Sequence, residues 1–323
     1  LIANPVSDAN SIPRATSKTP NTPALLLCPA RGIRRKNIGE LILLTLLAPK
    51  GTLTAITLAP ENSQWHAIHD RWEKFCVTHH LPVEFAVVDR IAPNPNSDAS
   101  FESWISHATH FITCSISEGF GLVFLESIAY GKPLIGRKIE HISNDLAKHG
   151  IEYDGLYEKI LIPADWVPHA ILEKHVKKSF TRLWQSWNRE AGAGECESVM
   201  ASMDHDGFLD FGNLPEALQE TIIEKLLDPD HHAIPQLLIN GRTRPLKAWI
   251  EDSLTQNHQT QAPQVPEAFT IAAYGEQTIA IHAMVMTQIP SPPAALDPNE
   301  ILETFLVADE FHFLKSTPDP NID

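Results

Sequence analysis

The sequence predicts an α/β fold that is built on a doubly wound parallel sheet. Two observations support this fold class between residues 24 and 190. Short apolar runs alternate with segments of helical apolar spacing, and polar or glycine-rich motifs follow directly after two of those runs. Alternation of this kind is typical of a parallel sheet that binds its ligand outside the carboxyl ends of its strands. We therefore expect the two motifs to meet at one edge of the sheet.

The elements follow from the periodicity of apolar residues along the chain. The apolar runs predict strands at 24–29, 52–58, 83–88, 110–115 and 134–136. Apolar residues at helical spacing predict helices at 38–47, 63–79, 101–108 and 168–188, with a further one that includes 125–130 and ends near Gly131 and Pro133.

The most informative motif runs from Ser117 to Glu126, where two carboxylates, Glu118 and Glu126, stand eight positions apart around a glycine-rich turn. This turn follows a predicted strand and begins a predicted helix. Free N–H groups and the dipole at a helix start favour an anion such as phosphate. Gly119 and Gly121 allow the backbone to approach that anion closely. The motif therefore predicts a phosphate site at this helix start.

The two carboxylates call for a different partner. A carboxylate beside a phosphate would be repelled, so Glu118 and Glu126 are better suited to accept hydrogen bonds from hydroxyl groups. Hydroxyl groups on both sides of a diphosphate describe a nucleotide sugar. We expect Glu126 to face the ribose and Glu118 to face the sugar. The alternative is an ordinary strand-to-helix turn with exposed glutamates.

With its flanking residues, S-E-G-F-G-L-V-F-L-E-S-I-A-Y-G-K-P-L-I at 117–135 resembles the signature of the retaining glycosyltransferases of family 4, which have the GT-B fold. The resemblance implies that this chain contains the donor-binding domain of such an enzyme. It also implies that the donor is contacted by further positions of the motif, namely Ser117, Gly119, Phe120, Gly121 and Leu122.

A second part of the resemblance lies in the loop after the first strand, at residues 30–37. Arg31 and Lys36 stand five residues apart there, and they are similar to an Arg/Lys pair of the family. The resemblance implies that both cations hold the diphosphate and offset the charge that develops on it. The catalytic residues that we expect are thus Arg31, Lys36 and Glu118, without a metal ion or another cofactor. Taken alone, the basic segment 31–36 would better suit a solvated loop, and its pairing with the glutamate motif favours the binding role.

Further along, the sequence departs from the family. Residues 135–142 stand where the family has a Gly-Gly-x-x-Glu-like loop, but the glycine pair is missing. Glu140 corresponds to the acidic residue of that loop. Arg137 and His141 either contact the ligand or belong to a surface loop. Residues 162–165 resemble the later Pro-x-Asp stretch of the family.

Composition limits the classes of function. The chain has 323 residues, of which 43% are hydrophobic, so it can bury a sizeable core. Its net charge of −15 argues against broad affinity for nucleic acids or anionic membranes. The four cysteines form no CxxC pair, which favours free thiols and a cytoplasmic location. No apolar run approaches the roughly 20 residues of a membrane span.

The predicted organisation has three parts. Residues 1–23 resemble an interdomain linker, 24–190 form the donor-binding domain, and 191–323 form a mainly helical extension. Helices are expected there at 215–227, 245–254 and 298–308, and also at 269–286, where strands remain an alternative. Because the first residues resemble the family's entry into its second domain, we expect an N-terminal acceptor domain in cis or in trans. The isolated chain would then be a fragment with little or no activity.

Two acidic clusters are candidate metal sites. Residues 202–213 match parts of a calcium loop, but Asn213 stands where such a loop needs a bidentate glutamate. Residues 228–232 contain two aspartates and two histidines without a third partner at ligand spacing. An Asp-rich capping turn and an exposed turn are the favoured interpretations, and no metal ligand is predicted.

The sequence thus predicts a hexosyltransferase donor domain of carbohydrate biosynthesis, whose partners are a nucleotide-sugar donor and an unidentified hydroxyl acceptor. The resemblance implies transfer with retention of configuration. One alternative is a non-catalytic nucleotide-sugar-binding subunit that needs a separate acceptor-domain partner. Another is an epimerase or a phosphorylase on a related scaffold.

Overall fold

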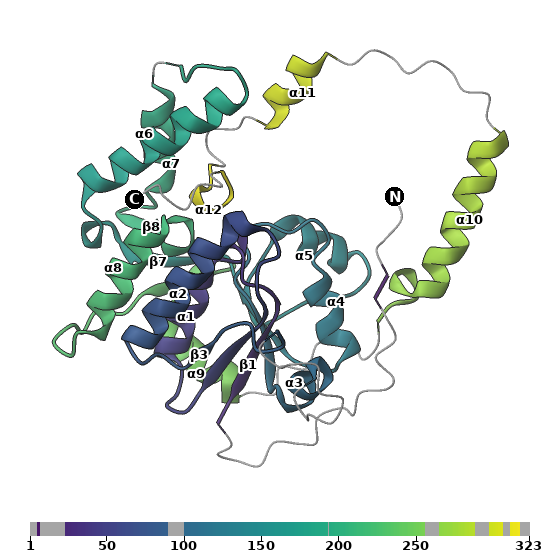
Figure 1. The fold of residues 1–323 in the computed structure, drawn as a ribbon, viewed down its shortest axis with the longest axis horizontal. Helices are drawn as coiled ribbons and strands as arrows, with labels where there is room; N and C mark the ends of the chain where they lie inside the picture. The colour runs from purple at the N-terminus through teal and green to yellow at the C-terminus, as the bar shows by residue number, and fades with distance from the viewer. Residues whose placement is uncertain are drawn as a thin grey trace.

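The centre of the protein is a six-stranded parallel sheet with the strand order β3-β2-β1-β4-β5-β6 (Figure 1). The structure is a computed structural model that describes residues 5–6, 23–89, 100–192, 194–255, 265–287, 297–305 and 311–316. The strands are β1 (Leu25–Arg31), β2 (Leu53–Leu58), β3 (Val83–Glu84), β4 (His110–Thr113), β5 (Leu134–Arg137) and β6 (Leu156–Tyr157). All neighbouring pairs in this sheet are parallel, which confirms the predicted fold class.

Helices cover both faces of this sheet because successive strand residues point to opposite sides. In β1, Leu26 packs in one core cluster and Leu27 in the other. The first cluster includes α1 (Ile38–Leu47) and α2 (His66–Thr78), and the second includes α3 (Phe101–His107), α4 (Leu122–Ala129) and α5 (Glu140–Ala147). Figure 1 shows these two helical layers on either side of the strands. Helix α5 was not predicted, because 137–142 was interpreted as a loop.

A second sheet has four antiparallel strands in the order β10-β9-β7-β8. They are β7 (Lys159–Pro163), β8 (Phe208–Asp210), β9 (Gln236–Ile239) and β10 (Arg242–Pro245). This sheet was not predicted, although Asn240-Gly241 is a strong signal for a two-residue hairpin and both residues have positive φ. The sheet combines β7, from before residue 190, with strands that follow it.

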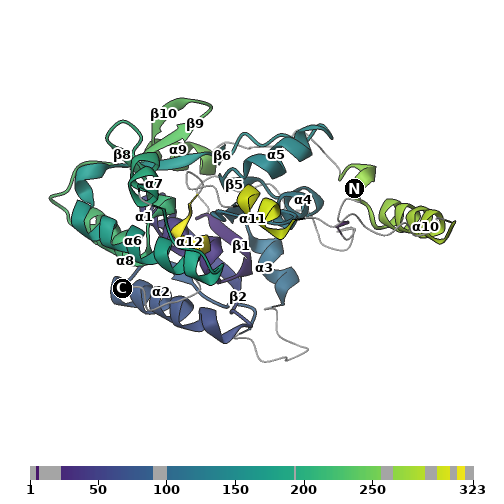
Figure 2. The same cartoon turned by 90° about the horizontal axis from the view of Figure 1, so that it is seen from above.

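The remaining elements are helical, as expected for the C-terminal region. They are α6 (His169–Ser186), α7 (Glu195–Met203), α8 (Glu216–Leu227), α9 (Leu246–Thr255), α10 (Ile271–Thr287), α11 (Pro298–Phe305) and α12 (Phe313–Ser316). Helix α10 corresponds to the helix predicted at 269–286. It has no buried residue, and it stands apart from both sheets in Figures 1 and 2. Helix α7 was not predicted.

Some of the predicted segments fall outside the described residues. They comprise nearly all of the predicted linker 1–23 and the last three residues of the helix predicted at 298–308. Within the described residues, no helix is both long and apolar enough to span a bilayer.

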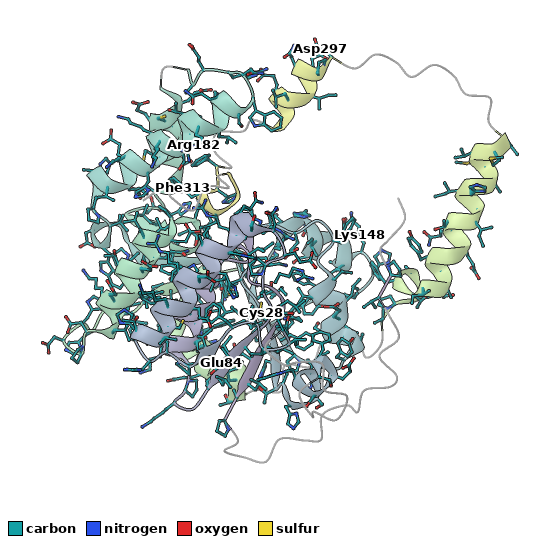
Figure 3. All side chains as sticks on the ribbon, in the orientation of Figure 1. Cys28, Glu84, Lys148, Arg182, Asp297 and Phe313 are labelled. Atoms are coloured by element: carbon teal, nitrogen blue, oxygen red, sulfur yellow. The ribbon has the colours of Figure 1, made fainter. Side chains whose placement is uncertain are left out.

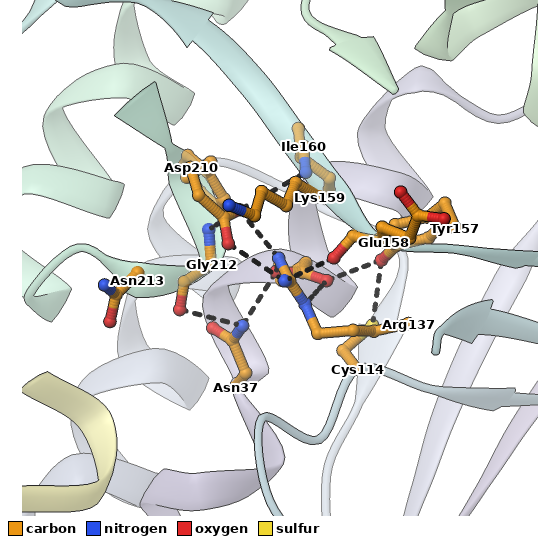
Figure 4. A network of polar contacts seen from close by, with 12 residues as sticks. Asn37, Cys114, Arg137, Tyr157, Glu158, Lys159, Ile160, Asp210, Gly212 and Asn213 are labelled. Atoms are coloured by element: carbon orange, nitrogen blue, oxygen red, sulfur yellow. Dashed lines mark hydrogen bonds and ion pairs between the residues drawn. The ribbon is translucent and has the colours of Figure 1, made fainter. Parts of the chain in front are cut away.

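A buried network of charged side chains connects the two sheets (Figure 4). Arg137, at the end of β5, donates to Glu40 of α1 at 2.8 and 2.6 Å and to Asp210 of β8 at 2.9 and 2.8 Å. The Tyr157 hydroxyl donates to the same glutamate at 2.5 Å. A Cβ on Gly212 would lie 2.0 Å from the Arg137 guanidinium, so this position has no room for a side chain. Arg137 therefore belongs to the core, and neither interpretation from the sequence, a ligand contact or a surface loop, was correct.

Replacing Arg137 with Met should lower the free energy of unfolding by about 3–5 kcal/mol, because two buried carboxylates would lose their common partner. Urea unfolding measures this loss. Lys148→Met is the matched control, since that side chain is 72% exposed, and the control should change stability by less than about 0.5 kcal/mol. A loss below about 1 kcal/mol for Arg137→Met would contradict a structural role for the network.

Candidate functional site

The candidate site lies where the order of the parallel strands reverses. The chain proceeds from β1 to β2 on one side, and β4 later pairs with the other side of β1. Ligands of open α/β sheets bind at such a point, outside the carboxyl ends of the strands. A cavity of about 460 Å³ opens there between the segments that follow β1 and β4. Cys28, near the centre of the molecule in Figure 3, is part of its lining.

This cavity brings together every predicted site residue except Ser117. Its lining includes Arg31, Lys36, Glu118, Gly119, Phe120, Gly121, Leu122 and Glu126. These residues come from two segments about 80 positions apart, so the predicted meeting of the two motifs is observed. Ser117 contributes its main-chain carbonyl, which accepts a hydrogen bond from Arg35 at 2.8 Å.

Helix α4 begins at the cavity because Gly121 turns the chain. Gly121 has φ 64° and ψ 42°, a left-handed conformation that suits glycine. A Cβ there would also lie 2.8 Å from Ile142 of α5. Beside Gly119, by contrast, a Cβ would meet nothing within 4 Å. The first amides of α4 lack intrahelical acceptors, as at any helix start, and can bind an anion.

Glu118 is paired with two cations. One carboxylate oxygen accepts from Lys36, and the other accepts from Arg35 at 2.7 Å. Burial opposes ionisation of this carboxyl, but the nearby Lys36 and the hydrogen bonds from Lys36 and Arg35 outweigh it and lower its pKa. Glu118 is therefore a carboxylate at neutral pH.

The Glu126 carboxyl differs from that of Glu118 in its hydrogen bonding and in the direction of its pKa shift. Its carboxyl group has no hydrogen bond or ion pair to any residue that the structure describes, although it lines the cavity. Burial raises its pKa, and the charge of Lys36 only partly offsets that rise. The group is half-buried, faces the cavity and retains its full capacity for hydrogen bonds with a ligand.

Arg31 and Lys36, which the resemblance pairs, have different partners. Arg31 forms an ion pair with Glu61 at 2.5 Å and donates to the Ala59 carbonyl at 3.1 Å. Both partners lie beyond the end of β2, while Lys36 points to Glu118. The two cations that converge on Glu118 are consequently Arg35 and Lys36. Arg35 was not among the predicted site residues, since the resemblance covers only Arg31 and Lys36.

The basic segment 31–36 is not a solvated loop. Arg34 is buried and donates to Glu216 of α8 through two hydrogen bonds of 2.6 Å. Asn37 has φ 53°, donates to Glu40 at 2.8 Å and accepts from Gln219 at 3.0 Å. Residues of the C-terminal region thus hold the short 3-10 helix Arg34–Lys36 against the start of α1.

Glu140, His141 and the four cysteines are the other residues that the sequence analysis considered. Glu140 is the first residue of α5, and the His141 ring donates a hydrogen bond of 3.1 Å to the Glu118 carbonyl. All four cysteines are free. Burial raises the pKa of Cys28 to about 11, so this thiol is protonated at neutral pH.

The acidic clusters do not assemble into a metal site. In the described part of the chain, no group of three His, Cys, Asp or Glu side chains is placed to hold a metal ion. Asp210, the ninth position of the calcium-like segment, is already paired with Arg137.

Solved structures with partial similarity to this chain have low sequence identity. The catalytic domain of cholesterol-α-glucosyltransferase from Helicobacter pylori is 15% identical, with a TM-score of 0.32 over 42% of this chain and 77% of its own. Sucrose-phosphate synthase from Thermosynechococcus elongatus is 16% identical, with a TM-score of 0.38 over 88% of this chain and 50% of its own. The pneumococcal O-GlcNAc transferase GtfA, in complex with UDP and GlcNAc, is 14% identical, with a TM-score of 0.35 over 89% and 39%.

With TM-scores below 0.5, these similarities carry no argument about what this chain does. The chain spans half or less of the length of two of the three proteins. No protein-family model and no curated protein matches the sequence.

Replacing Gly121 with Ala should lower the free energy of unfolding by about 2 kcal/mol, because the new Cβ both disfavours the left-handed conformation and meets Ile142. Gly119→Ala, two residues earlier, is the matched control and should change stability by less than about 1 kcal/mol. Chemical unfolding of both variants gives the comparison. Equal losses in the two variants would contradict a specific need for glycine at position 121.

Replacing Lys36 with Met should raise the pKa of the Glu118 carboxyl, because burial then opposes ionisation with only the hydrogen bonds from Arg35 and Ser115 to offset it. Carbon-13 NMR of the carboxyl measures the shift. A carboxyl whose pKa is lowered by folding stabilises the protein above its unfolded pKa. The stability difference between wild type and variant should therefore be full near pH 7 and shrink as the pH falls through the folded-state pKa of Glu118. An unchanged titration curve would contradict the pairing.

Proposed function

We propose that the cavity binds the donor of a glycosyl transfer, a nucleotide diphosphate sugar, and that the chain is the donor-binding half of a retaining hexosyltransferase. One observation carries the proposal: a helix start, a group of cations and two carboxylates meet in one cavity at the strand reversal. The first two features suit a diphosphate, and the carboxylates suit the hydroxyl groups on either side of it. A volume of about 460 Å³ falls in the usual range of small-molecule sites.

Each part of the donor then has a partner in the cavity. The diphosphate lies at the start of α4, within reach of Lys36 and the other cations of the lining. The ribose hydroxyls bind Glu126, whose carboxyl has no other partner among the described residues. Glu118 binds the sugar hydroxyls. Ser117, Phe120 and Leu122 complete the loop around the donor, as the resemblance implies.

The proposed reaction breaks the bond between the anomeric carbon and the diphosphate oxygen and forms a bond from that carbon to an acceptor hydroxyl. The acceptor approaches from the face that the diphosphate leaves, so configuration is retained, and its proton passes to the departing diphosphate. Lys36 and the amides near Gly121 stabilise the negative charge that develops on that group. Cations of the chain do this work in our proposal, without a divalent metal ion.

The acceptor requires more than this cavity. We propose that an acceptor domain is supplied in cis or in trans, and that the chain alone is inactive or weak, because positioning of the acceptor contributes much of the rate of a group transfer. The proposed setting is the cytoplasm.

The nucleotide is the part of the proposal that can be tested first. Thermal-shift measurements with the common nucleoside diphosphates should identify at least one that stabilises the full chain, since a ligand that binds only the folded state raises its apparent stability. Nucleoside monophosphates and free hexoses at equal concentration are the comparison. If no nucleoside diphosphate stabilises the chain at millimolar concentration, the proposal is wrong.

Replacing Glu126 with Ala should weaken binding of the identified nucleoside diphosphate about tenfold or more, because a hydrogen bond to a charged group contributes about 1.5–3 kcal/mol. Binding of inorganic pyrophosphate, which has no ribose, should change less than about twofold. Titration calorimetry measures both affinities. Glu152→Ala replaces an exposed glutamate outside the cavity and should leave both unchanged. Equal effects of Glu126→Ala on the two ligands would exclude the ribose role.

A further inference from the structure

Glu118 ties together the two segments that form the walls of the cavity. Its Oε1 accepts from Lys36 and its Oε2 accepts from Arg35 at 2.7 Å, so each oxygen of one carboxylate has its own cation. The same Arg35 nitrogen donates to the Ser117 carbonyl at 2.8 Å. The carboxylate side chain is 9% exposed, while Arg35 is 40% exposed and Lys36 is 17% exposed. The acceptor is thus more enclosed than its donors.

The geometry of this contact is that of an anion site. Two donors that converge on two oxygens of one carbon can also converge on two oxygens of one phosphorus atom. Arginine suits such binding because its guanidinium presents several parallel donors, and lysine suits it as a compact charge. The Glu118 carboxylate therefore stands in for a phosphate between Arg35 and Lys36.

Arg31 is arranged differently, although it lines the same cavity. Its guanidinium is paired with Glu61 and the Ala59 carbonyl, on the side of the cavity that adjoins β2. A phosphate beside Lys36 would find Arg35 directed toward it, whereas Arg31 would first have to leave its own partners.

The backbone under the two cations is fixed independently of Glu118. Arg34 forms a buried, two-bonded pair with Glu216, and the Arg35 carbonyl accepts from the Ile116 amide at 3.1 Å. If the Glu118 side chain were displaced, these contacts would keep the backbone of Arg35 and Lys36 in place. The site is preorganised for exchange of one anion for another.

We propose that Arg35 and Lys36 form a phosphate-binding pair and that Glu118 is its internal competitor, displaced when a phosphate group of the ligand arrives. The inference rests on the proposed function for the identity of that ligand, a nucleoside diphosphate or its sugar ester. It assigns the second phosphate-binding cation to Arg35 in place of Arg31.

The exchange has a consequence for selectivity. While Glu118 is paired with both cations, its oxygens are committed and cannot accept from sugar hydroxyls. Binding of a phosphate to Arg35 and Lys36 releases the carboxylate, which then turns to the sugar. The cavity should therefore discriminate against free sugars, because they offer no anion to release Glu118. Binding of the phosphate and recognition of the sugar become coupled events.

The test measures binding of inorganic pyrophosphate to the full chain by titration calorimetry at low salt. Glu118→Gln removes the competing charge and keeps the shape of the side chain, so affinity should rise about tenfold, which corresponds to about 1.4 kcal/mol. Arg35→Gln should lower affinity about tenfold. In the double variant Glu118→Gln/Arg35→Gln, most of the gain should be lost. Thermal melting of each variant verifies that it is folded.

Glu61→Gln is the matched control, because the same substitution there releases Arg31 instead of Arg35. It should change pyrophosphate affinity less than about twofold. If pyrophosphate affinity rises as much for Glu61→Gln as for Glu118→Gln, the second cation is Arg31 and the inference is wrong. If Arg35→Gln leaves pyrophosphate affinity unchanged, the inference is wrong as well. Pyrophosphate affinity of Glu118→Gln that is equal to or lower than that of the wild type would overturn the inference as well. So would the absence of measurable pyrophosphate binding to both the wild type and Glu118→Gln.

Failure of this inference can be distinguished from failure of the proposed function. If nucleoside diphosphates bind the wild type but Glu118→Gln shows no gain for pyrophosphate, only the inference is wrong. If pyrophosphate shows the expected pattern and no nucleoside diphosphate binds, the phosphate pair is retained and the nucleotide-sugar proposal is wrong.

Discussion

The buried ion triad of Glu40, Arg137 and Asp210 is the interaction on which the arrangement of this protein depends. Arg137 ends strand β5 of the parallel sheet, Glu40 lies in α1, and Asp210 belongs to the antiparallel sheet. Burial of three charges is costly unless every donor and acceptor is matched. Four hydrogen bonds of 2.6–2.9 Å join Arg137 to the two carboxylates. They favour one relative position of the two sheets, because a shift would leave a charge without its partner.

The C-terminal region also fixes the segment that supplies the cations of the cavity. Glu216 and Gln219 of α8 hold Arg34 and Asn37, which flank the cations Arg35 and Lys36. A basic segment of four charges within six residues would otherwise repel itself and sample many conformations. Residues beyond 190 thus contribute to the site without touching the cavity. The region beyond residue 190 therefore affects the positions of Arg35 and Lys36.

Local signals in the sequence were sufficient for five of the six strands of the parallel sheet and for the Glu118–Glu126 turn, whereas β6, which has two residues, was not predicted. Strands β1 and β4 contain the apolar runs Leu25–Cys28 and Phe111–Ile112, and the turn is defined by its own glycines. The antiparallel sheet was missed because its strands have three to five residues and because β7 pairs with β8 and β9 across long stretches of chain. Helix α5 was missed because the resemblance placed a loop at 137–142.

Long-range contacts explain why the roles of individual arginines differ between the prediction and the structure. The buried partner of Arg34 is 182 residues away, so nothing near residues 31–36 distinguishes a core arginine from a solvated one. Arg137 was ambiguous for the same reason, since its carboxylates come from α1 and β8. Among the cations, the resemblance drew attention to Arg31 and Lys36, whereas the choice of Arg35 as the second partner of Glu118 depends on side-chain directions that spacing does not encode.

We propose that one cavity holds a nucleoside diphosphate between the start of α4 and the cations after β1. A crystal structure of the full chain with the nucleoside diphosphate that stabilises it most would test this directly. Our account predicts density for the diphosphate at the amides near Gly121 and beside Lys36, with the ribose hydroxyls at hydrogen-bond distance from Glu126. Density for the nucleotide at another place on the molecule, or a ribose turned away from Glu126, would contradict it.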